Sequence, residues 1–366
     1  MARQLLAIAA GLLVVSMVTP ATFAAQDELV IRMPNKKVSS VRGTIKQESL
    51  KLFRIVDPNG QAMPDFTGDQ ILEVKWDIPD FEYMRAKELF EKNQFAAAAT
   101  SFQACLDSPN LRQAAHAYVA LMCGDSYRRG NKPEEAEKVL EALIEKHPDS
   151  WYIPQAIDKL VDACSASGNF KKMTPLLSKL RGLPGNIYKA KATMYEGRMY
   201  QHQKKIDAAM NKFNEAASAT SDPETRGQAK MMLADCYVAK NQYEKAQETA
   251  KAAITSEAPK AVLAYAHLVI GNTYYQQAMN AKGDAAKKLY LDAILEYLRV
   301  WTLYPGQERV EGEALYKAGE SFKFLSRLPG RRSDRRRAAN MFSTVNAKFP
   351  GSSWAKKAAK AMAEVK

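Results

Sequence analysis

The sequence contains little of what a catalytic or metal site needs. Its 366 residues include only four histidines and four cysteines, and it has no C-x-x-C pair, H-E-x-x-H, Walker loop, G-x-S-x-G or calcium loop. The four histidines have no partner at metal-ligand spacing within a helix, so we expect surface or packing roles for His116, His147, His202 and His267. We therefore predict no catalytic residue, no metal, no cofactor and no enzymatic activity.

Long apolar runs are also missing after the first 24 residues, because charges interrupt every later helical stretch. The opening residues combine Arg3 with an apolar run from Leu5 to Val18, a break at Pro20 and small residues up to Ala24. This layout is typical of a secretory signal peptide. The run is too short for an ordinary membrane span, so a retained anchor is the weaker alternative. We expect cleavage near Ala24 and a periplasmic or secreted chain.

Cysteine pairing is the next question, since an exported chain meets an oxidising compartment. Cys105, Cys123, Cys164 and Cys236 each lie within an apolar helical pattern. Buried free thiols are the favoured interpretation. A disulfide between Cys105 and Cys123 is the alternative.

Acidic residues are scarce toward the C-terminus. The formal net charge is +13, and residues 301–366 contain 14 Lys and Arg against 6 Asp and Glu. Such an excess favours an acidic partner, an anionic lipid surface or nucleic acid, or it is a solvated basic surface. We expect no nucleic acid, because the chain is predicted to be exported and no stacking aromatics are interleaved with the arginines.

Residues 25–78 are predicted to form a small all-β, barrel-like module. Apolar and polar residues alternate over residues 29–33, 41–45, 50–56 and 71–76, and Asp57-Pro58-Asn59-Gly60 is typical of a turn.

Residues 79–350 show helical periodicity and a recurring pattern. A small residue is followed by an aromatic three positions later, an alanine twelve positions later and a bulky residue four beyond that. The clearest examples are Gly124, Tyr127, Ala136 and Leu140, then Gly197, Tyr200, Ala209 and Phe213, then Ala234, Tyr237 and Ala246. A glycine or alanine lets two helices cross closely, and stacked hairpins then share one core. About seven units are expected, if about ten residues are inserted near 279–288 and about seven near 327–334. Residues 351–366 are predicted to be a capping helix.

The pattern resembles the tetratricopeptide repeat (TPR) family over Phe81 to Pro350. The export signal and the closing residues Lys348 to Ser352 are similar to exported bacterial repeat proteins of the periplasmic envelope-assembly and cell-division-coordinator type. The resemblance implies a right-handed α-α superhelix whose first helices form a concave groove for a peptide or partner helix.

On this alignment the groove presents polar residues with aromatic anchors. The expected groove residues are Tyr83, Lys87, Phe90, Leu121, Asp125, Arg128, Arg198, Gln201, Asp235, Asn272, Tyr275, Glu320 and Lys323. The pattern departs from the subfamily that binds a C-terminal carboxylate, because Leu121, Met194 and Met231 replace its Lys and Asn. Capture of a C-terminal carboxylate is therefore not predicted.

An arginine-rich run is the second candidate surface. Six arginines lie within eleven residues, and they are predicted to form a loop entering the last repeat: Arg327, Arg331, Arg332, Arg335, Arg336 and Arg337. Arginine forks pair with carboxylates or phosphates, whereas many charge runs are simply solvated. The chain is therefore expected to be a protein-binding scaffold. The alternative is an envelope-associated structural protein attached to an anionic surface by its basic C-terminal region.

Overall fold

The structure is a computed structural model that describes residues 26–35, 37–256 and 258–365. The predicted signal peptide and its cleavage point lie outside these residues. The chain divides into two compact units. The first comprises the described residues up to Glu48 together with Leu52–Asp77, and the second comprises Ser49–Lys51 and the residues from Ile78 onward.

The first unit is built on an open, four-stranded antiparallel sheet. Its strands β1 (Asp27–Arg32), β2 (Val38–Gln47), β3 (Arg54–Val56) and β4 (Ile71–Lys75) lie in the order β3-β2-β1-β4. The alternation seen in the sequence has the expected result, since the apolar members of each strand face one small core: Leu29, Ile31, Ile45, Phe53, Ile55 and Ile71.

Gly43 and Asp27 have specific roles in the packing of the first unit's strands. A Cβ at Gly43 would lie 2.1 Å from the carbonyl oxygen of Val56, so β2 approaches β3 too closely for any side chain there. Asp27 is fully buried, and its carboxylate accepts backbone hydrogen bonds from Ile45 and Asp77 at 2.9 and 2.8 Å.

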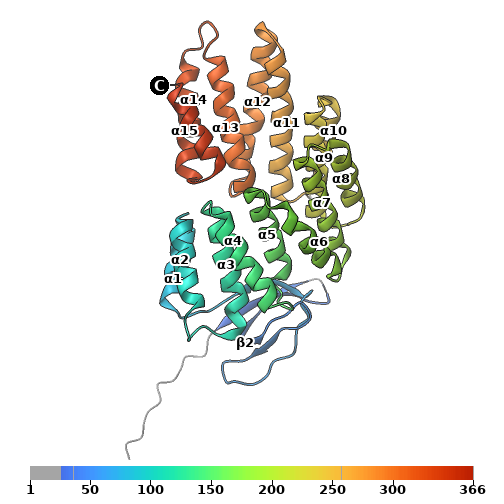
Figure 1. The fold of residues 1–366 in the computed structure, drawn as a ribbon, viewed down its shortest axis with the longest axis vertical. Coiled ribbons are helices and arrows are strands. Elements are labelled where there is room, and N and C mark those ends of the chain that lie inside the picture. Colours follow the sequence, from blue (N-terminus) through green and yellow to red (C-terminus); the bar gives the residue numbers. More distant parts are fainter. Residues whose placement is uncertain (1–25, 36, 257, 366) are drawn as a thin grey trace, which may run out of the picture. The chain divides into compact units, whose positions relative to one another are not determined.

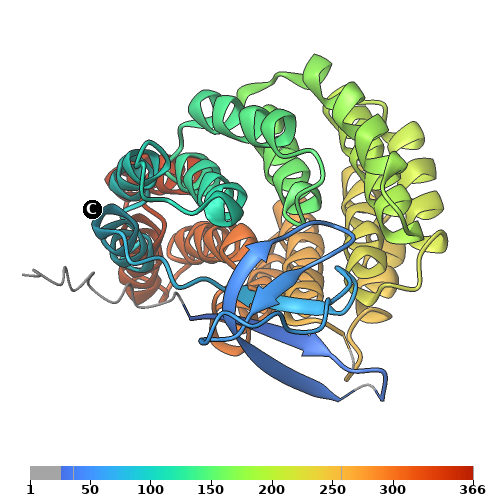
Figure 2. The ribbon, with the colours of Figure 1, turned by 90° about the horizontal axis from the view of Figure 1, so that it is seen from below.

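The second unit is a succession of antiparallel helix pairs (Figure 1), which follow one another along a curve in Figure 2. The helices, in seven pairs and a final single helix, are α1 (Phe81–Glu91) and α2 (Phe95–Leu106); α3 (His116–Arg129) and α4 (Pro133–Lys146); α5 (Ile153–Ser167) and α6 (Met173–Gly182); α7 (Asn186–His202) and α8 (Ile206–Ser218); α9 (Pro223–Ala239) and α10 (Tyr243–Lys251); α11 (Lys260–Asn280) and α12 (Gly283–Leu303); α13 (Glu308–Leu325) and α14 (Ser333–Lys348); and α15 (Ser353–Ala363). This confirms the predicted fold class.

The small residues of the sequence pattern lie where the two helices of a pair cross. A Cβ added to the glycine would meet the bulky residue of the second helix at 2.5–2.6 Å in four pairs, namely Gly124 with Leu140, Gly197 with Phe213, Gly271 with Tyr297, and Gly319 with Phe342. The close approach of the helices therefore depends on the missing side chain.

The turns inside the pairs share a second feature that the sequence pattern did not include. Seven residues after the crossing position, the backbone adopts a left-handed conformation with φ of 58–59° at Asn93, Asn131, Lys204 and Asn241, and of 79° at Gly168. Asparagine and glycine tolerate this conformation better than other residues. In five successive pairs, the first helix is thus followed by a residue in the same left-handed conformation.

The insertion expected near residues 279–288 is helical. It extends both α11 and α12 to 21 residues and leaves a short turn at Gly283, whose φ is 61°. The long pair is also joined by a buried polar contact, because His267 Nδ1 lies 2.6 Å from the carboxylate of Glu296, which also pairs with Arg299.

All four cysteines are buried free thiols in this structure, as the favoured interpretation of the sequence predicted. Burial raises the pKa of each thiol to about 12. Cys123 Sγ faces the carbonyl oxygen of Ala99 at 3.5 Å. Within the described residues, every helix is too short or too polar to cross a membrane.

Candidate functional site

The predicted groove residues lie on the first helices of successive pairs. Neighbouring first helices contact one another at α3–α5, α7–α9, α9–α11 and α11–α13, whereas contacts between neighbouring second helices are sparse. Elements that approach each other more closely lie on the inside of a curve, so the first helices line the inner side of the second unit.

Charged residues on these first helices form ion pairs with the next first helix. Asp125 of α3 is buried and contacts Arg128 at 2.7 Å and Lys159 of α5 at 3.0 Å. Burial by itself would raise the pKa of Asp125, but Lys159 and Arg128 outweigh it and hold that pKa below its ordinary value. Arg198 of α7 pairs in the same way with Asp162 of α5, at 2.8 Å.

The same arrangement continues along the later helices. Asp235 of α9 accepts a hydrogen bond from Tyr265 of α11, and Asn272 of α11 donates one to Glu313 of α13 at 3.5 Å. Lys323 of α13 reaches Glu364, just after α15, at 3.2 Å and Glu320 at 2.8 Å. We call these contacts, together with those of Asp125 and Arg198, the first-helix ladder.

The ladder changes the interpretation of most predicted groove residues. Asp125, Arg128, Arg198, Asp235, Asn272, Glu320 and Lys323 already have partners within the chain. Their side chains stabilise the stacking of repeats because each bond crosses from one repeat to the next or orients a residue that does.

Several aromatic and apolar residues predicted for the groove pack against neighbouring helices. Tyr83 is buried and packs against Phe102, with ring centroids 6.1 Å apart. Phe90 packs edge-on against Phe95, and Tyr275 packs edge-on against Tyr290. Leu121, Met194 and Met231 are core residues. The buried members of this group fill space between helices, whereas Phe90 and Tyr275 are half-buried. Of the predicted set, Lys87 is exposed and Gln201 is half-buried.

The sequence analysis did not predict the acidic residues of α5 that complete the first-helix ladder. Asp158 and Asp162 of α5 face Lys191 and Arg198 of α7, and Lys191 contacts Asp158 at 2.6 Å. The sequence carried a signal for these ion pairs. Asp158 and Asp162 are four residues apart, and Lys191 and Arg198 are seven apart, so each pair of residues lies on one face of its helix.

A cleft of about 660 Å³ combines two predicted groove residues with residues from the end of the repeats. Its cations are Arg128, Arg129, Arg198 and Lys348, its carboxylates are Asp162 and Glu308, and its aromatic walls are Phe95, Phe349 and Trp354. Arg129 forms an ion pair with Glu308, so α3 is bonded directly to α13 across 179 residues of sequence. We call this site the repeat-closure cleft.

The repeat-closure cleft has a mixed chemical character. The guanidinium of Arg129 lies 4.2 Å from the ring centre of Phe95 and 4.7 Å from that of Phe90, and Trp354 packs against Tyr316. Cations exceed carboxylates by two among its charged residues. Aromatic walls and a positive excess suit an extended segment with apolar and acidic side chains.

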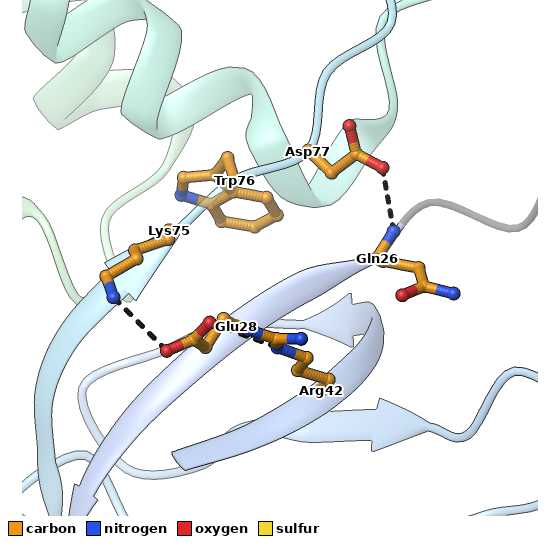
Figure 3. Close-up of a pocket in the computed structure, with 6 residues that line it drawn as sticks. All are labelled: Gln26, Glu28, Arg42, Lys75, Trp76 and Asp77. Atoms are coloured by element: carbon orange, nitrogen blue, oxygen red, sulfur yellow. Dashed lines mark hydrogen bonds and ion pairs between the residues drawn. The ribbon is translucent and has the colours of Figure 1, made fainter.

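The β module has a smaller, polar pocket of about 320 Å³ (Figure 3). Glu28 lies between Arg42 and Lys75, at 3.2 and 3.1 Å, and the backbone N–H of Gln26 donates to Asp77 at 2.8 Å. Hydrogen bonds from Lys75 and Arg42 hold the pKa of Glu28 below its ordinary value. The charges satisfy one another and connect β1 to its two neighbouring strands.

The arginine-rich run does not form a single loop. Arg335, Arg336 and Arg337 belong to the first turns of α14, which corrects the prediction that all six lie in the loop. Arg331 and Arg337 pair with the buried Asp334 at 2.6 and 2.7 Å. These two arginines stabilise the start of α14, because a buried carboxylate needs partners.

Two stretches of the chain match family models. Residues 83–150 and residues 227–259 each match a model described as tetratricopeptide repeat. Together with the stacked helix pairs, they place the chain among helical repeat proteins. These two stretches of the chain are tetratricopeptide repeats.

Several solved structures are similar to this chain at low sequence identity. A tetratricopeptide repeat protein from Parabacteroides merdae is 11% identical, with 78% of this chain and 97% of that chain covered and a TM-score of 0.47. PilF of Pseudomonas aeruginosa is 17% identical, with 66% and 95% covered and a TM-score of 0.37. Rap protein complexed with competence and sporulation factor is 15% identical, with 72% and 75% covered and a TM-score of 0.46. These similarities are too low to indicate a shared function. No match was found among curated proteins.

Proposed function

We propose that this chain is an exported, non-enzymatic scaffold that binds a peptide segment of a partner protein in the repeat-closure cleft. The observation that supports the proposal most strongly is the cleft itself, where Arg128, Arg198 and Lys348 lie beside Phe349 and Trp354. A cleft of this size falls within the usual range of ligand sites, about 300–1,000 Å³. The expected partner segment is extended, acidic and partly aromatic.

Two features of the described residues bear on metal and thiol chemistry. Within residues 26–35, 37–256 and 258–365, no group of three or more His, Cys, Asp or Glu is placed to hold a metal ion. The thiols are buried with raised pKa values, which disfavours the nucleophilic thiolate.

The cleft proposal is tested by peptide selection. A random peptide library is selected on the chain lacking residues 1–24, and the enriched peptides are measured by fluorescence anisotropy. K348S/F349A should weaken binding about tenfold or more, because it removes an exposed cation and an aromatic wall. K356S removes one exposed charge from α15, outside the cleft, and should bind as the original chain does. Equal affinity for both variants would exclude the cleft.

Export is tested separately. The proposal predicts that the chain isolated from the envelope or medium of its native cells begins at Ala25. An intact Met1 in a chain recovered from the cytoplasm would contradict it.

Attachment to an anionic surface is a second candidate function. It is favoured by exposed cations at the C-terminal end, where Arg332, Arg336, Lys356 and Lys360 lack an ion pair among the residues that the structure describes. Electrostatic attachment weakens as salt screens it. Co-sedimentation with anionic vesicles should therefore fall steeply as salt rises, and salt-independent sedimentation would contradict this candidate.

A further inference from the structure

A second cavity lies where the end of α13, the turn before α14 and the last described residues meet. Its volume is about 350 Å³, and four of its lining residues are cations: Lys323, Arg327, Arg332 and Arg335. Among the described residues, Glu364 is the one carboxylate that lines it. These described lining residues therefore carry a formal excess of three positive charges. When charges of one sign line a partly enclosed cavity, they concentrate the electrostatic potential in the space between them.

Three of these cations are held in place by neighbouring groups. The guanidinium of Arg327 lies over the ring of Phe324, 5.1 Å from its centre. Arg335 Nε donates to the carbonyl oxygen of Val365 at 3.1 Å. Lys323 contacts Glu364 at 3.2 Å. Anchored side chains lose less conformational freedom when a ligand binds, which favours binding.

Arg327 and Arg332 differ from Arg331 and Arg337 of the same run. Arg331 and Arg337 are engaged by Asp334, at 2.6 and 2.7 Å. In contrast, no carboxylate pairs with Arg327 or Arg332 anywhere in the described part of the chain, and both side chains are exposed at the cavity. Two guanidinium groups that reach the cavity from opposite ends of one turn are thus available to an anion.

We propose that this cavity binds a phosphate group and that Arg327 and Arg332 donate the hydrogen bonds that hold it. One guanidinium donates two parallel hydrogen bonds to a pair of oxygens. Two such forks can therefore use the oxygens of a phosphate, whereas a carboxylate supplies only one pair. The volume suits a phosphate ester or a lipid head group, because small-molecule sites begin at about 300 Å³.

This inference is independent of the repeat-closure cleft and refines the second candidate function. It names the chemical group that an anionic surface would have to present. Because a free phosphate compound has the same chemistry as a lipid head group, the phosphate site can exist even if surface attachment fails, and the experiment treats the two sources separately.

The direct test is calorimetric titration with inorganic pyrophosphate in about 50 mM salt, where screening is modest. The chain lacking residues 1–24 should bind pyrophosphate, and R327S/R332S should lose affinity about tenfold or more. R336S/K356S is the matched control, since it also removes two exposed cations but neither residue lines the cavity. The control should stay within about twofold of the original chain, because distant exposed charges are screened. R332K, which keeps the charge but loses the fork, should bind more weakly than the original chain.

A second arm uses vesicles of phosphatidylglycerol in phosphatidylcholine. Vesicle binding that is lost in R327S/R332S and kept in R336S/K356S identifies a lipid head group as the source of the phosphate. Pyrophosphate binding without vesicle binding identifies a free phosphate compound instead. The proposal is overturned if the original chain binds neither probe, or if the control variant weakens binding as much as R327S/R332S does. Circular dichroism of each variant checks that α13 and α14 remain folded.

Discussion

At the scale of single residues, Gly319 shows how closely the helices of a pair approach. A Cβ at this position would lie 2.5 Å from the ring of Phe342, whereas a Cβ at Gly312, in the same helix, would meet nothing closer than 3.4 Å. Gly319→Ala should therefore destabilise the protein by about 1–3 kcal/mol through overpacking. Gly312→Ala should be neutral or stabilising by about 0.5–1 kcal/mol, because alanine favours helix.

Thermal or urea unfolding of the two variants checks this prediction. If Gly319→Ala is as stable as Gly312→Ala, then α13 and α14 do not cross at this position as described.

The thiols allow a second prediction at this scale. All four cysteines are buried, and burial raises the pKa of each to about 12. A thiol reagent such as Ellman's reagent should therefore label the native chain slowly at mildly alkaline pH, because the thiolate is the reactive form. After unfolding without a reductant, all four thiols should react. Two reactive thiols instead of four would indicate the Cys105–Cys123 disulfide.

The sequence predicted the packing of the repeat pattern far better than the roles of the groove residues. Gly197 and Phe213 belong to a repeated pattern whose spacing follows from helix geometry, so their packing could be foreseen. Asp125 could not be assigned in this way. Its partner Lys159 lies on the next repeat, and the rotation between repeats decides which faces meet. An aspartate on a groove position therefore looks the same in sequence whether it faces a partner protein or the neighbouring helix.

At the scale of elements, Glu137 connects α4 to the end of α5 and to the turn that precedes α6. Its side chain is almost fully buried, and it accepts hydrogen bonds from Ser167 and Asn169 and pairs with Lys172 at 3.0 Å. Burial by itself would raise the pKa of Glu137, but these hydrogen bonds outweigh it and hold that pKa below its ordinary value of 4.5.

The direction of this shift gives a pH prediction. A carboxyl group with a lowered pKa in the folded state adds stability above about pH 4.5, and that stability is lost as pH falls toward the folded-state pKa. Glu137→Gln should therefore lower the thermal midpoint at pH 7 and reduce its drop between pH 7 and pH 4. Glu141→Gln is the control, since Glu141 contacts the same Lys172 but is more exposed. An identical pH dependence in Glu137→Gln and the original chain would contradict the prediction.

The arginine run and the α11–α12 insertion show why element boundaries were harder to predict. Residues 335–337 and residues 283–288 are rich in Arg, Lys and Ala, which suit both an exposed helix and a solvated insertion. In the structure both segments extend helices. At α14 the deciding contact is the buried Asp334, whose pairing with Arg331 and Arg337 depends on the folded helix.

At the scale of the whole molecule, α15 packs on the last helix pair. Its buried alanines, Ala355, Ala358 and Ala361, belong to the same core cluster as Leu325 and Phe342. A chain ended at Pro350 would expose this apolar surface, as loss of a terminal cap does in other repeat proteins. We predict a thermal midpoint lower by about 5 °C or more and an increased tendency to associate.

Differential scanning calorimetry and light scattering measure these two effects. K356S/K360S, which keeps α15 but removes two of its exposed charges, serves as the control. A truncated chain that is as stable and as monodisperse as this control would contradict the capping role.

The central claim is that the polar residues of the first helices join the repeats to one another and leave the repeat-closure cleft for a partner. Hydrogen–deuterium exchange, with and without a selected peptide, tests it most directly. We expect added protection at the ends of α3 and α7 and over residues 348–354, with little change in the second helices α8 and α10. Protection confined to those second helices or to the β module, with none at the cleft, would contradict it.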